Sequence, residues 1–340
     1  METLWFCLVA IMIAGYVALD GFDIGAGIVH LLVARSDAEK RIVLSSIGPV
    51  WDGNEVWLLA GGGTLYFAFP ALYASSFSGF YLPLMIVLWL LIVRGISIEF
   101  RSHVASPLWA PLWDTGFGGA SLLLAIFYGA ALGNVVRGVP LDRSGYFFLP
   151  LWSDFRASSN AGILDWYTIL TGVTALLALT MHGALWVRMK SHAPISERAA
   201  LLAGRVWWGV AAATAGITEA SFAVQPHLSE RFAEAPWGYV FPALALVGLL
   251  GVFLCTAAQT EALAFFSSCG YLIGMLTSAA FGVYPLLLPA STDPALSLTI
   301  NNAAAGSYGL GIGLAWWLPG MLLASGYAIF TYRRFAGKLR

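Results

Sequence analysis

The chain has 340 residues, of which 59% are hydrophobic and only 10% are charged, and its mean hydropathy is +0.79. Soluble domains carry about 25% charged residues, so this composition excludes an ordinary soluble protein and indicates a multi-pass membrane protein. No basic run is long enough to bind nucleic acid, and the three scattered cysteines form neither a zinc motif nor a disulfide framework. We expect a single membrane domain over residues 1–340.

Nine apolar segments are long enough to cross a bilayer as helices, since one span requires about 20 apolar residues. The first segment lacks a basic start and a small-residue cleavage site, so we expect it to be retained rather than removed as a signal peptide. The pattern predicts an all-α membrane protein with nine transmembrane helices. The segments cover residues 4–33, 43–68, 72–97, 115–137, 162–189, 199–224, 239–257, 262–286 and 307–332.

Lys and Arg are divided unevenly between the alternate links that join these segments. Thirteen of the 17 fall on the side that holds the first link and the C-terminus. The other side carries Arg137, Arg143, Arg156 and Arg231. Because basic residues concentrate on the cytoplasmic side, we expect the N-terminus outside and the C-terminus in the cytoplasm. The two long links, 138–161 and 288–306, are then both outside.

The first segment carries two acids, Asp20 and Asp23, within the run ALDGFDIGAGI. They are three residues apart and therefore share one face of a helix. Gly21 and Gly25 have the spacing of a close helix-packing face. Asp23 lies at a depth similar to that of Asp52 in the next segment, so we expect the acids of the two segments to meet at one level.

The second segment contains IGPVWDGNEVWLLAGGG, in which Trp51, Asp52, Asn54 and Glu55 lie close together. A carboxylate at hydrocarbon depth costs at least about 2.5–3.5 kcal/mol, so it is tolerated only where it faces protein, water or a partner. Pro49 cannot donate a backbone hydrogen bond and disfavours helix before it. We therefore expect a kink or a late helix start that lets water reach Asp52.

The third segment ends in the run RGISIEFR, which holds Arg94, Glu99 and Arg101. The two arginines are candidate counter-ions for the buried acids, and either of them can neutralise Glu99. From the residues alone, three interpretations of the acids remain open. They are structural ion pairing, proton conduction and ion coordination.

Only one of the five histidines, His182, is placed deep within a predicted span. A haem held by two histidines requires ligands on facing helices, and the sequence offers no second deep histidine. We therefore expect no haem in this chain and interpret His182 as a hydrogen-bonded residue of the core.

The runs ALDGFDIGAGI, VWDGNEVWL and RGISIEFR together resemble subunit II of the cytochrome bd-type quinol oxidases. The likeness is specific in the first hundred residues and continues more weakly through MHGALWVRMK to the end. It implies nine helices arranged as two four-helix bundles plus one peripheral helix. It also implies a place in the bacterial cytoplasmic (inner) membrane and in a respiratory electron-transport chain.

The resemblance further implies a heterodimer with a haem-bearing subunit I, which would hold haems b and d, together with small accessory subunits and lipid. This chain would contain no catalytic residue, metal or haem, although a structural quinone is expected on it. The complex would oxidise quinol and reduce dioxygen to water with cytoplasmic protons. In that family the proton route passes through the positions of Asp52, beside Trp51, and of Asp23 and Arg94.

We therefore predict that the chain supplies a cytoplasmic proton path and structural support to subunit I. Two alternatives are a secondary transporter that uses its buried carboxylates as coupling sites, and a purely structural subunit. Transporters place such residues near the midplane and often contain inverted repeats, whereas these charges cluster near the inner third. The predicted path comprises Asp52, Asp23, Asp20, Glu55, Trp51, Arg94, Glu99 and Arg101.

Overall fold

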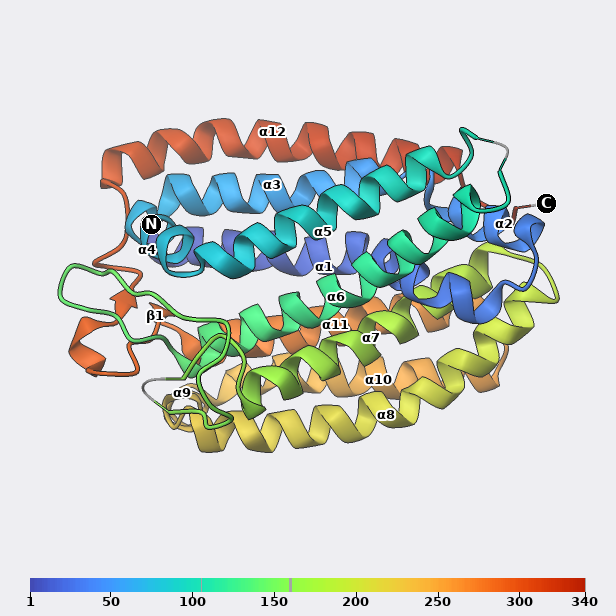
Figure 1. The fold of residues 1–340 in the computed structure, drawn as a ribbon. Helices are drawn as coiled ribbons and strands as arrows, with labels where there is room; N and C mark the ends of the chain where they lie inside the picture. Colours follow the sequence, from blue (N-terminus) through green and yellow to red (C-terminus); the bar gives the residue numbers. More distant parts are fainter. Residues whose placement is uncertain (105, 159–160, 340) are drawn as a thin grey trace.

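The structure is a computed structural model that describes residues 1–104, 106–158 and 161–339. The helices are α1 (Glu2–Val33), α2 (Asp37–Ile47), α3 (Trp51–Ala68), α4 (Pro70–Gly79), α5 (Tyr81–Phe100), α6 (Trp109–Arg137), α7 (Trp166–Lys190), α8 (Ile195–Val224), α9 (His227–Glu234), α10 (Val240–Ala257), α11 (Glu261–Val283) and α12 (Ser307–Arg334). The shorter elements are η1 (Pro236–Tyr239), β1 (Leu286–Leu288), η2 (Pro294–Leu296) and β2 (Leu298–Thr299). The long helices run side by side along one direction, with the start of α1 at one end of the molecule and the finish of α12 at the other (Figure 1).

Eight helices of the described residues are long and apolar enough to cross a membrane. They are α1, α5, α6, α7, α8, α10 together with η1, α11 and α12. The prediction of an all-α membrane protein is confirmed, apart from the short β1–β2 hairpin, whereas the count of nine spans is not established by these helices. The remaining candidate is α3, which has 18 residues and runs alongside the others but begins with three polar side chains (Figure 1).

The predicted segment over residues 43–68 is interrupted near Pro49, where a kink or a late helix start was expected. The structure divides this segment into α2, which ends two residues before Pro49, and α3, which starts at Trp51. Proline lacks an amide hydrogen and its ring clashes with the preceding helical turn, so a helix ends in front of it. The predicted late helix start beside Asp52 is therefore confirmed.

The predicted helix over residues 72–97 is also divided in the structure. The helix α4 ends at Gly79, Phe80 lies between the two helices, and α5 follows. Pro70 opens α4 and Pro83 lies in the first turn of α5, where the amide missing from proline would have no helical acceptor in any case. The sequence pattern did not reveal this break because both halves are apolar.

The other predicted segments correspond to single long helices, with shifts at their ends. The fourth begins at Trp109 rather than at residue 115. The eighth ends at Val283, because Tyr284 and Pro285 turn the chain into β1. The short helix α9 between α8 and α10 was not predicted.

The helix α1 lies at the centre of the molecule and contacts α3, α6, α7 and α11. Every residue from Asp20 to His30 is buried, so this part of α1 is surrounded on all sides. A helix that is buried all round is normally apolar all round. The burial of Asp20, Asp23 and His30 therefore requires polar partners on the neighbouring helices.

The helices α1 and α7 touch through a pair of glycines. A methyl group on Gly25 would lie 2.2 Å from the carbonyl oxygen of Leu179 and 2.7 Å from the Cα atom of Gly183. A methyl group on Gly183 would lie 2.1 Å from the backbone carbon of Gly25. The close packing face predicted on the first segment is thus confirmed at Gly25, where two backbones are in direct contact.

The two long links that were predicted to share one side lie together at one end of the molecule, which we call the hairpin end. The amide of Val139 donates to the carbonyl of Pro289 at 2.9 Å, and the carbonyl of Val139 accepts from the amide of Ser291 at 2.9 Å. The strands β1 and β2 pair antiparallel beside them. Buried apolar side chains from both links pack around Trp5 of α1.

The helix α12 is peripheral. Leu310 is the only residue of α12 that is buried in the described structure. Large apolar side chains are exposed along its length, including Trp316 at 78% and Leu323 at 76%. In Figure 1 the helix lies along one edge, beside α3.

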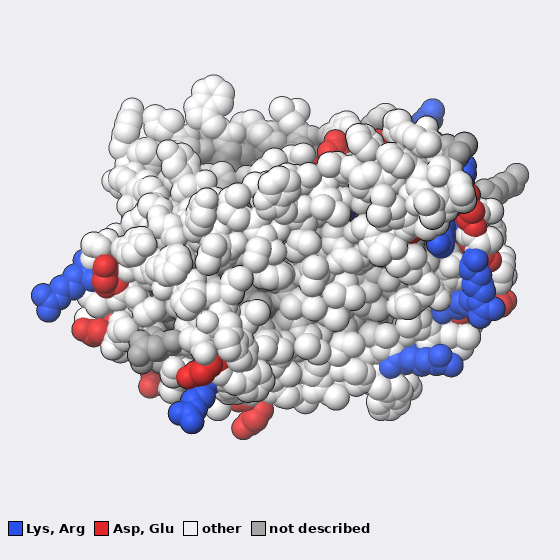
Figure 2. Space-filling model, viewed as in Figure 1, with Lys and Arg blue, Asp and Glu red and all other residues white. Residues whose placement is uncertain are grey.

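Charged side chains gather at the two ends of the face shown in Figure 2, and the broad band between them is almost free of charge. The end that carries α2 and the residues after α12 is called the α2 end below. An uncharged band between two charged ends is the pattern of a protein that spans a bilayer.

The glycine contact between α1 and α7 makes a matched prediction about stability. We expect Gly25→Ala to destabilise the protein by about 1–3 kcal/mol, because the added methyl group overlaps backbone atoms that cannot move independently. The control is Gly119→Ala on α6, where a methyl group would meet nothing within 4 Å. Both changes bring the same helix-propensity gain. The melting temperature of the detergent-solubilised protein should fall for Gly25→Ala but not for Gly119→Ala. Equal melting temperatures of the two variants would contradict the backbone contact between α1 and α7.

Candidate functional site

Asp20 on α1 is paired with Arg94 on α5 inside the helix bundle. The Arg94 Nη1 atom donates to Asp20 Oδ2 at 2.9 Å, and Nη2 donates to Oδ1, so the contact is bidentate. Neither side chain has any exposed surface. Since a buried charge is tolerated only when it is paired and hydrogen-bonded, each of these residues depends on the other.

Glu55 on α3 is the third member of this cluster. Its Oε2 atom lies 3.9 Å from Arg94 Nη1, and its side chain is 25% exposed. Glu55 therefore links the buried ion pair to the outside of the bundle. Three of the predicted path residues, from three different helices, are brought together at one level.

Asp23 has a different environment from Asp20. The Asn54 Nδ2 atom donates to Asp23 Oδ2 at 2.7 Å, and the hydroxyl of Tyr332 on α12 donates to Asn54 Oδ1 at 2.8 Å. Asp23 is fully buried, its Oδ1 atom has no hydrogen-bond partner, and no ion pair in the described structure includes it. Asp23 is thus a buried carboxyl group with one satisfied oxygen and one free oxygen.

Asp52 does not meet Asp23, contrary to the expectation that the acids of the two segments come together. The residue that faces α1 is Asn54, and positions two apart on a helix point in nearly opposite directions. Asp52 is exposed, and its carboxylate has no hydrogen bond or ion pair within the described residues. The neighbouring Trp51 packs against α5, with ring carbons 3.5 Å from the position of a Cβ on Gly95.

Arg101 belongs to a separate cluster at the α2 end. It donates to Asp114 Oδ1 on α6 at 2.6 Å and to Asp37 Oδ1 on α2 at 2.7 Å, while Lys40 Nζ donates to Asp114 Oδ2 at 3.0 Å. The hydrogen bonds from Arg101, and then from Arg41, hold the pKa of Asp37 below its ordinary value. This cluster ties the surface helix α2 to the ends of α5 and α6.

The prediction that an arginine neutralises Glu99 is wrong. Glu99 is exposed, and the described structure contains no ion pair between it and Arg94 or Arg101. Arg101 is two positions farther along the chain, so it points to the opposite side of the helix. Glu99 therefore lies outside both clusters.

His182 is a hydrogen-bonded residue of the core, as predicted. Its Nδ1 atom lies 2.7 Å from Ser268 Oγ and its Nε2 atom lies 3.0 Å from the carbonyl oxygen of Ala18. Both ring nitrogens are engaged, so neither is directed at a ligand. In the residues that the structure describes, no three His, Cys, Asp or Glu side chains gather as a metal site would require.

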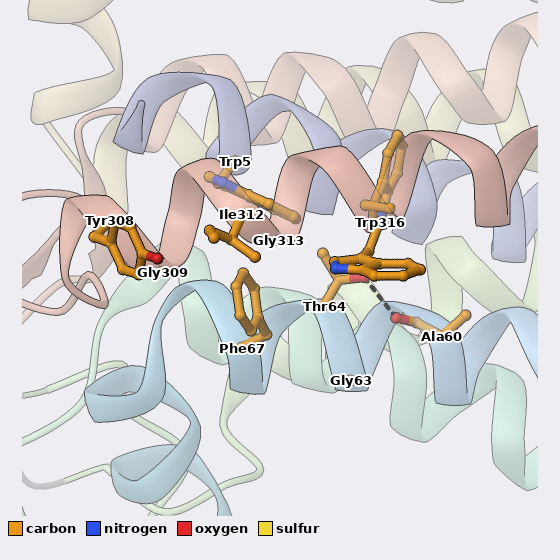
Figure 3. A pocket seen from close by; sticks show the side chains of 11 residues that line it. Trp5, Ala60, Gly63, Thr64, Phe67, Tyr308, Gly309, Ile312, Gly313 and Trp316 are labelled. Carbon is orange, nitrogen blue, oxygen red and sulfur yellow. Dashed lines mark hydrogen bonds between the residues drawn. The ribbon is translucent and has the colours of Figure 1, made fainter.

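A groove of about 620 Å³ lies between α1, α3 and α12 near the hairpin end (Figure 3). Aromatic side chains dominate its lining, with Trp5 from α1, Phe67 from α3, and Trp316 and Trp317 from α12. The Thr64 hydroxyl is turned back to the Ala60 carbonyl of its own helix at 2.8 Å (Figure 3). The groove is therefore apolar and distinct from the carboxylate cluster.

The family of the chain follows from its match to known sequences. A family model described as cytochrome bd terminal oxidase subunit II matches residues 1–335. This chain belongs to that family. It is accordingly a subunit of an oxidoreductase complex that is embedded in a membrane.

Curated relatives of this subunit II agree over nearly its whole length. It is 30% identical to cytochrome bd-I ubiquinol oxidase subunit 2 of Escherichia coli, over 100% of this chain and 95% of the relative. The same identity and shares describe a probable cytochrome oxidase subunit 2 of Haemophilus influenzae. The cytochrome bd ubiquinol oxidase subunit 2 of Bacillus subtilis is 30% identical over 91% of this chain and 88% of that one.

A solved structure of bd oxidase from Geobacillus thermodenitrificans has the same fold as this subunit II. The match has a TM-score of 0.74 and covers 98% of both chains, at 19% sequence identity. At that level of identity the likeness concerns the fold alone.

Sequence reasoning missed several polar residues of subunit II that the fold brings to these clusters. Tyr332 reaches Asn54 across 278 residues of chain, and no local pattern signals that contact. Asp114 was overlooked although it is an acid close to the start of a predicted span. The contact of His30 with this acid was not foreseen either: its Nε2 atom lies 3.6 Å from Asp114 Oδ1.

The buried pair predicts a specific pattern of stability in subunit II. We expect Arg94→Gln to destabilise the protein by about 3–5 kcal/mol, because it leaves the Asp20 charge buried without a partner. The double variant Asp20→Asn with Arg94→Gln should recover a large part of that loss, since no charge remains. Thermal unfolding checks both, with the exposed Arg143→Gln as the control. A double variant no more stable than Arg94→Gln would show that charge neutralisation is not the reason for the pair.

Proposed function

We propose that this chain is the haem-free subunit II of a bd-type terminal oxidase that couples quinol oxidation to the reduction of dioxygen to water. In this proposal it pairs with a haem-bearing subunit I and supplies both structural support and a path for cytoplasmic protons. Membership of the family and the names of the bacterial relatives, which are ubiquinol oxidase subunits, support the role in the complex.

We further propose that α3 is a ninth crossing of the bacterial inner membrane. Its 18 residues extend about 27 Å at 1.5 Å per residue, close to the 30 Å hydrocarbon core. Nine crossings agree with a chain that starts at the hairpin end and finishes at the α2 end. In this arrangement α1, α3, α5 and α6 form one bundle, α7, α8, α10 and α11 form the second, and α12 is peripheral. The basic α2 end faces the cytoplasm.

The observation that carries the proton path is the layer of acids shared by α1 and α3. Asp23 is buried with one free oxygen, Glu55 is partly exposed beside Arg94, and Asp52 is exposed on the side of α3 that faces away from α1. A purely structural role accounts well for Asp20, whose charge is matched by Arg94. It does not account for Asp23 or Asp52, which form no ion pair in the described structure.

The exposed face around Asp52 is the surface that we assign to subunit I. Val56 and Leu59 follow Asp52 on the same side of α3, and their side chains are 52% and 72% exposed. The Asp52 carboxylate therefore borders an apolar surface. A carboxylate is not tolerated against lipid chains, whereas an apolar surface needs lipid or protein to cover it. A partner chain satisfies both requirements, and Asp52 then lies at the boundary between the two subunits.

In the proposed mechanism, water from the cytoplasm reaches the turn between α2 and α3, where the helix start at Trp51 leaves Asp52 open. Asp52 takes up a proton and passes it across the boundary to subunit I, where oxygen is reduced. Glu55 is one turn farther along the same face of α3 and can exchange protons with Asp52. Arg94 fixes the position of Glu55 through their mutual attraction, while it remains hydrogen-bonded to Asp20.

The transporter alternative receives no support from the comparisons, because the relatives named above are oxidase subunits. A purely structural subunit remains the competing account. It differs from ours in the oxygen consumption and proton uptake expected when Asp52 is replaced by a neutral residue.

The test of the proton path is Asp52→Asn in the assembled complex. We expect oxygen consumption to fall by roughly tenfold or more, since relay groups typically contribute about 100-fold or more to proton transfer and water can bypass part of the loss. Proton uptake from the cytoplasmic side should fall in proportion. The optical spectrum must first show an unchanged haem content, so that a loss of assembly is not mistaken for a blocked relay.

The control is Asp154→Asn, which makes the same change at an exposed site in the link between α6 and α7. It should leave both rates unchanged. Full oxidase activity and full charge separation in Asp52→Asn would favour the purely structural account.

We place the structural quinone expected on subunit II in the aromatic groove between α1, α3 and α12. Its apolar lining suits an isoprenoid tail, and Trp5 and Phe67 offer ring faces for stacking. Trp317 lines the groove, and its indole N–H is buried without a hydrogen-bond acceptor. A quinone carbonyl would supply that acceptor. The quinone stabilises the subunit in this proposal and takes part in no redox step there.

This placement predicts the quinone content of purified variants. Trp317→Phe keeps an aromatic ring but removes the donor, so we expect quinone retention after a detergent wash to fall about two- to tenfold, the value of one neutral hydrogen bond. The control is Trp208→Phe on the exposed surface of α8. Chromatography of the extracted quinone gives the measurement. Equal retention in the two variants would remove the quinone from this groove.

A further inference from the structure

A cavity of about 200 Å³ lies at the α2 end, beneath the residues that follow α12. Lys190 of α7 holds this tail in place, because its Nζ atom donates to the carbonyls of Phe335 at 2.5 Å and Gly337 at 3.2 Å. The tail residues are exposed, so the cavity borders the solvent. Its inner lining is contributed by Ser45, Ser46, Pro49, Val50, Trp186 and Tyr332.

Tyr332 is the residue that connects this cavity to the buried acids. It lines the cavity, and its hydroxyl donates to Asn54 Oδ1 at 2.8 Å. Asn54 in turn donates to Asp23 Oδ2 at 2.7 Å. Three helices, α12, α3 and α1, thus contribute one residue each to a chain of hydrogen bonds that runs from the cavity to Asp23.

The direction of these hydrogen bonds is fixed by the backbone. The Nδ2 atom of Asn54 also donates to the carbonyl oxygen of Leu19 at 3.3 Å, and a carbonyl can only accept. The amide nitrogen of Asn54 therefore faces α1 and its oxygen faces Tyr332, which must donate. Because Oδ2 of Asp23 already accepts from Asn54, the proton of a neutral Asp23 belongs on Oδ1, the oxygen without a partner.

A carboxamide neither gains nor releases a proton near neutral pH, so the Tyr332–Asn54 pair is not itself a proton wire. Its effect is on position and access. Tyr332 holds the Asn54 amide in the one orientation that donates to Asp23, and Tyr332 is the member of this chain of hydrogen bonds that lines the cavity.

We propose that Tyr332 is a positioning residue for Asp23, which it orients through Asn54 and separates from the water of the cavity at the α2 end. This rests on the proposed function, in which Asp23 belongs to the proton path and the α2 end faces the cytoplasm. Movement of the Tyr332 ring would admit water to the free oxygen of Asp23, whereas the closed arrangement of the structure keeps the carboxyl group dry.

The test is Tyr332→Phe in the assembled complex, with infrared spectroscopy of the Asp23 carboxyl group as the readout. The Asp23 band is identified as the one that disappears in Asp23→Asn. In Tyr332→Phe we expect this band to shift, because Asn54 loses its fixed orientation, and its response to D₂O to become at least several-fold faster. Turnover should fall by several-fold at unchanged haem content.

The matched control is Tyr271→Phe, which removes another buried tyrosine hydroxyl, bonded to Thr214 at 2.7 Å, away from Asp23. It should leave the Asp23 band and its exchange rate unchanged. The proposal is overturned if Tyr332→Phe also leaves both unchanged. If Asp23→Asn retains full turnover and proton uptake while Tyr332→Phe still shifts the band, the proton path fails and the positioning role of Tyr332 stands.

Discussion

The bidentate ion pair between Asp20 and Arg94 is the interaction on which the rest of the site depends. Both groups are buried in the centre of the helix bundle, where an unpaired charge would destabilise the folded protein by several kcal/mol. Their contact fixes α5 against α1, and the attraction of Glu55 to the same guanidinium adds α3. The hydrogen bond between Asp23 and Asn54 joins two of the same helices, α1 and α3.

Asp20 and Asp23 differ in which of the interpretations left open by the sequence, structural ion pairing or proton conduction, fits them. Structural pairing describes Asp20, since its charge is balanced by Arg94. It does not describe Asp23, which accepts one amide hydrogen bond and forms no ion pair within the described residues. The two acids share one helix face and one depth, yet only the second has a free oxygen. The assignment of Asp23 to proton transfer rests on this difference.

Close helix packing makes the arrangement of polar groups possible. Gly25 and Gly183 bring α1 and α7 into backbone contact, so that α1 is enclosed on every side from Asp20 to His30. Farther toward the α2 end, Asp114 collects hydrogen bonds from Arg101 and Lys40 and so anchors α2 across the bundle. The close packing around α1 and the Asp114 cluster therefore limit the routes by which water can enter from the α2 end.

The sequence predicted the membrane class and most long helices, because apolar runs of sufficient length have few other structures available. It did not predict the break at Phe80, where both flanking helices are apolar, or the short helix α2. The count of residues from the basic ends of the segments correctly placed acids of α1 and α3 at one level. It could not tell which side of α3 faces α1. Asn54 rather than Asp52 makes that contact.

Tyr332 could not be foreseen for a similar reason. It joins the site from the opposite end of the chain, and only the packing of α12 beside α3 brings it to Asn54.

The central claim is that Asp52 lies between cytoplasmic water and the oxygen-reducing partner. A structure of the complete oxidase, at a resolution that reveals ordered water, tests it most directly. Our account predicts that subunit I covers the face of α3 that carries Asp52, and that water molecules connect this carboxylate to the solution at the α2 end. A carboxylate of Asp52 that faces lipid, or that is sealed from both the partner and the solvent, would contradict it.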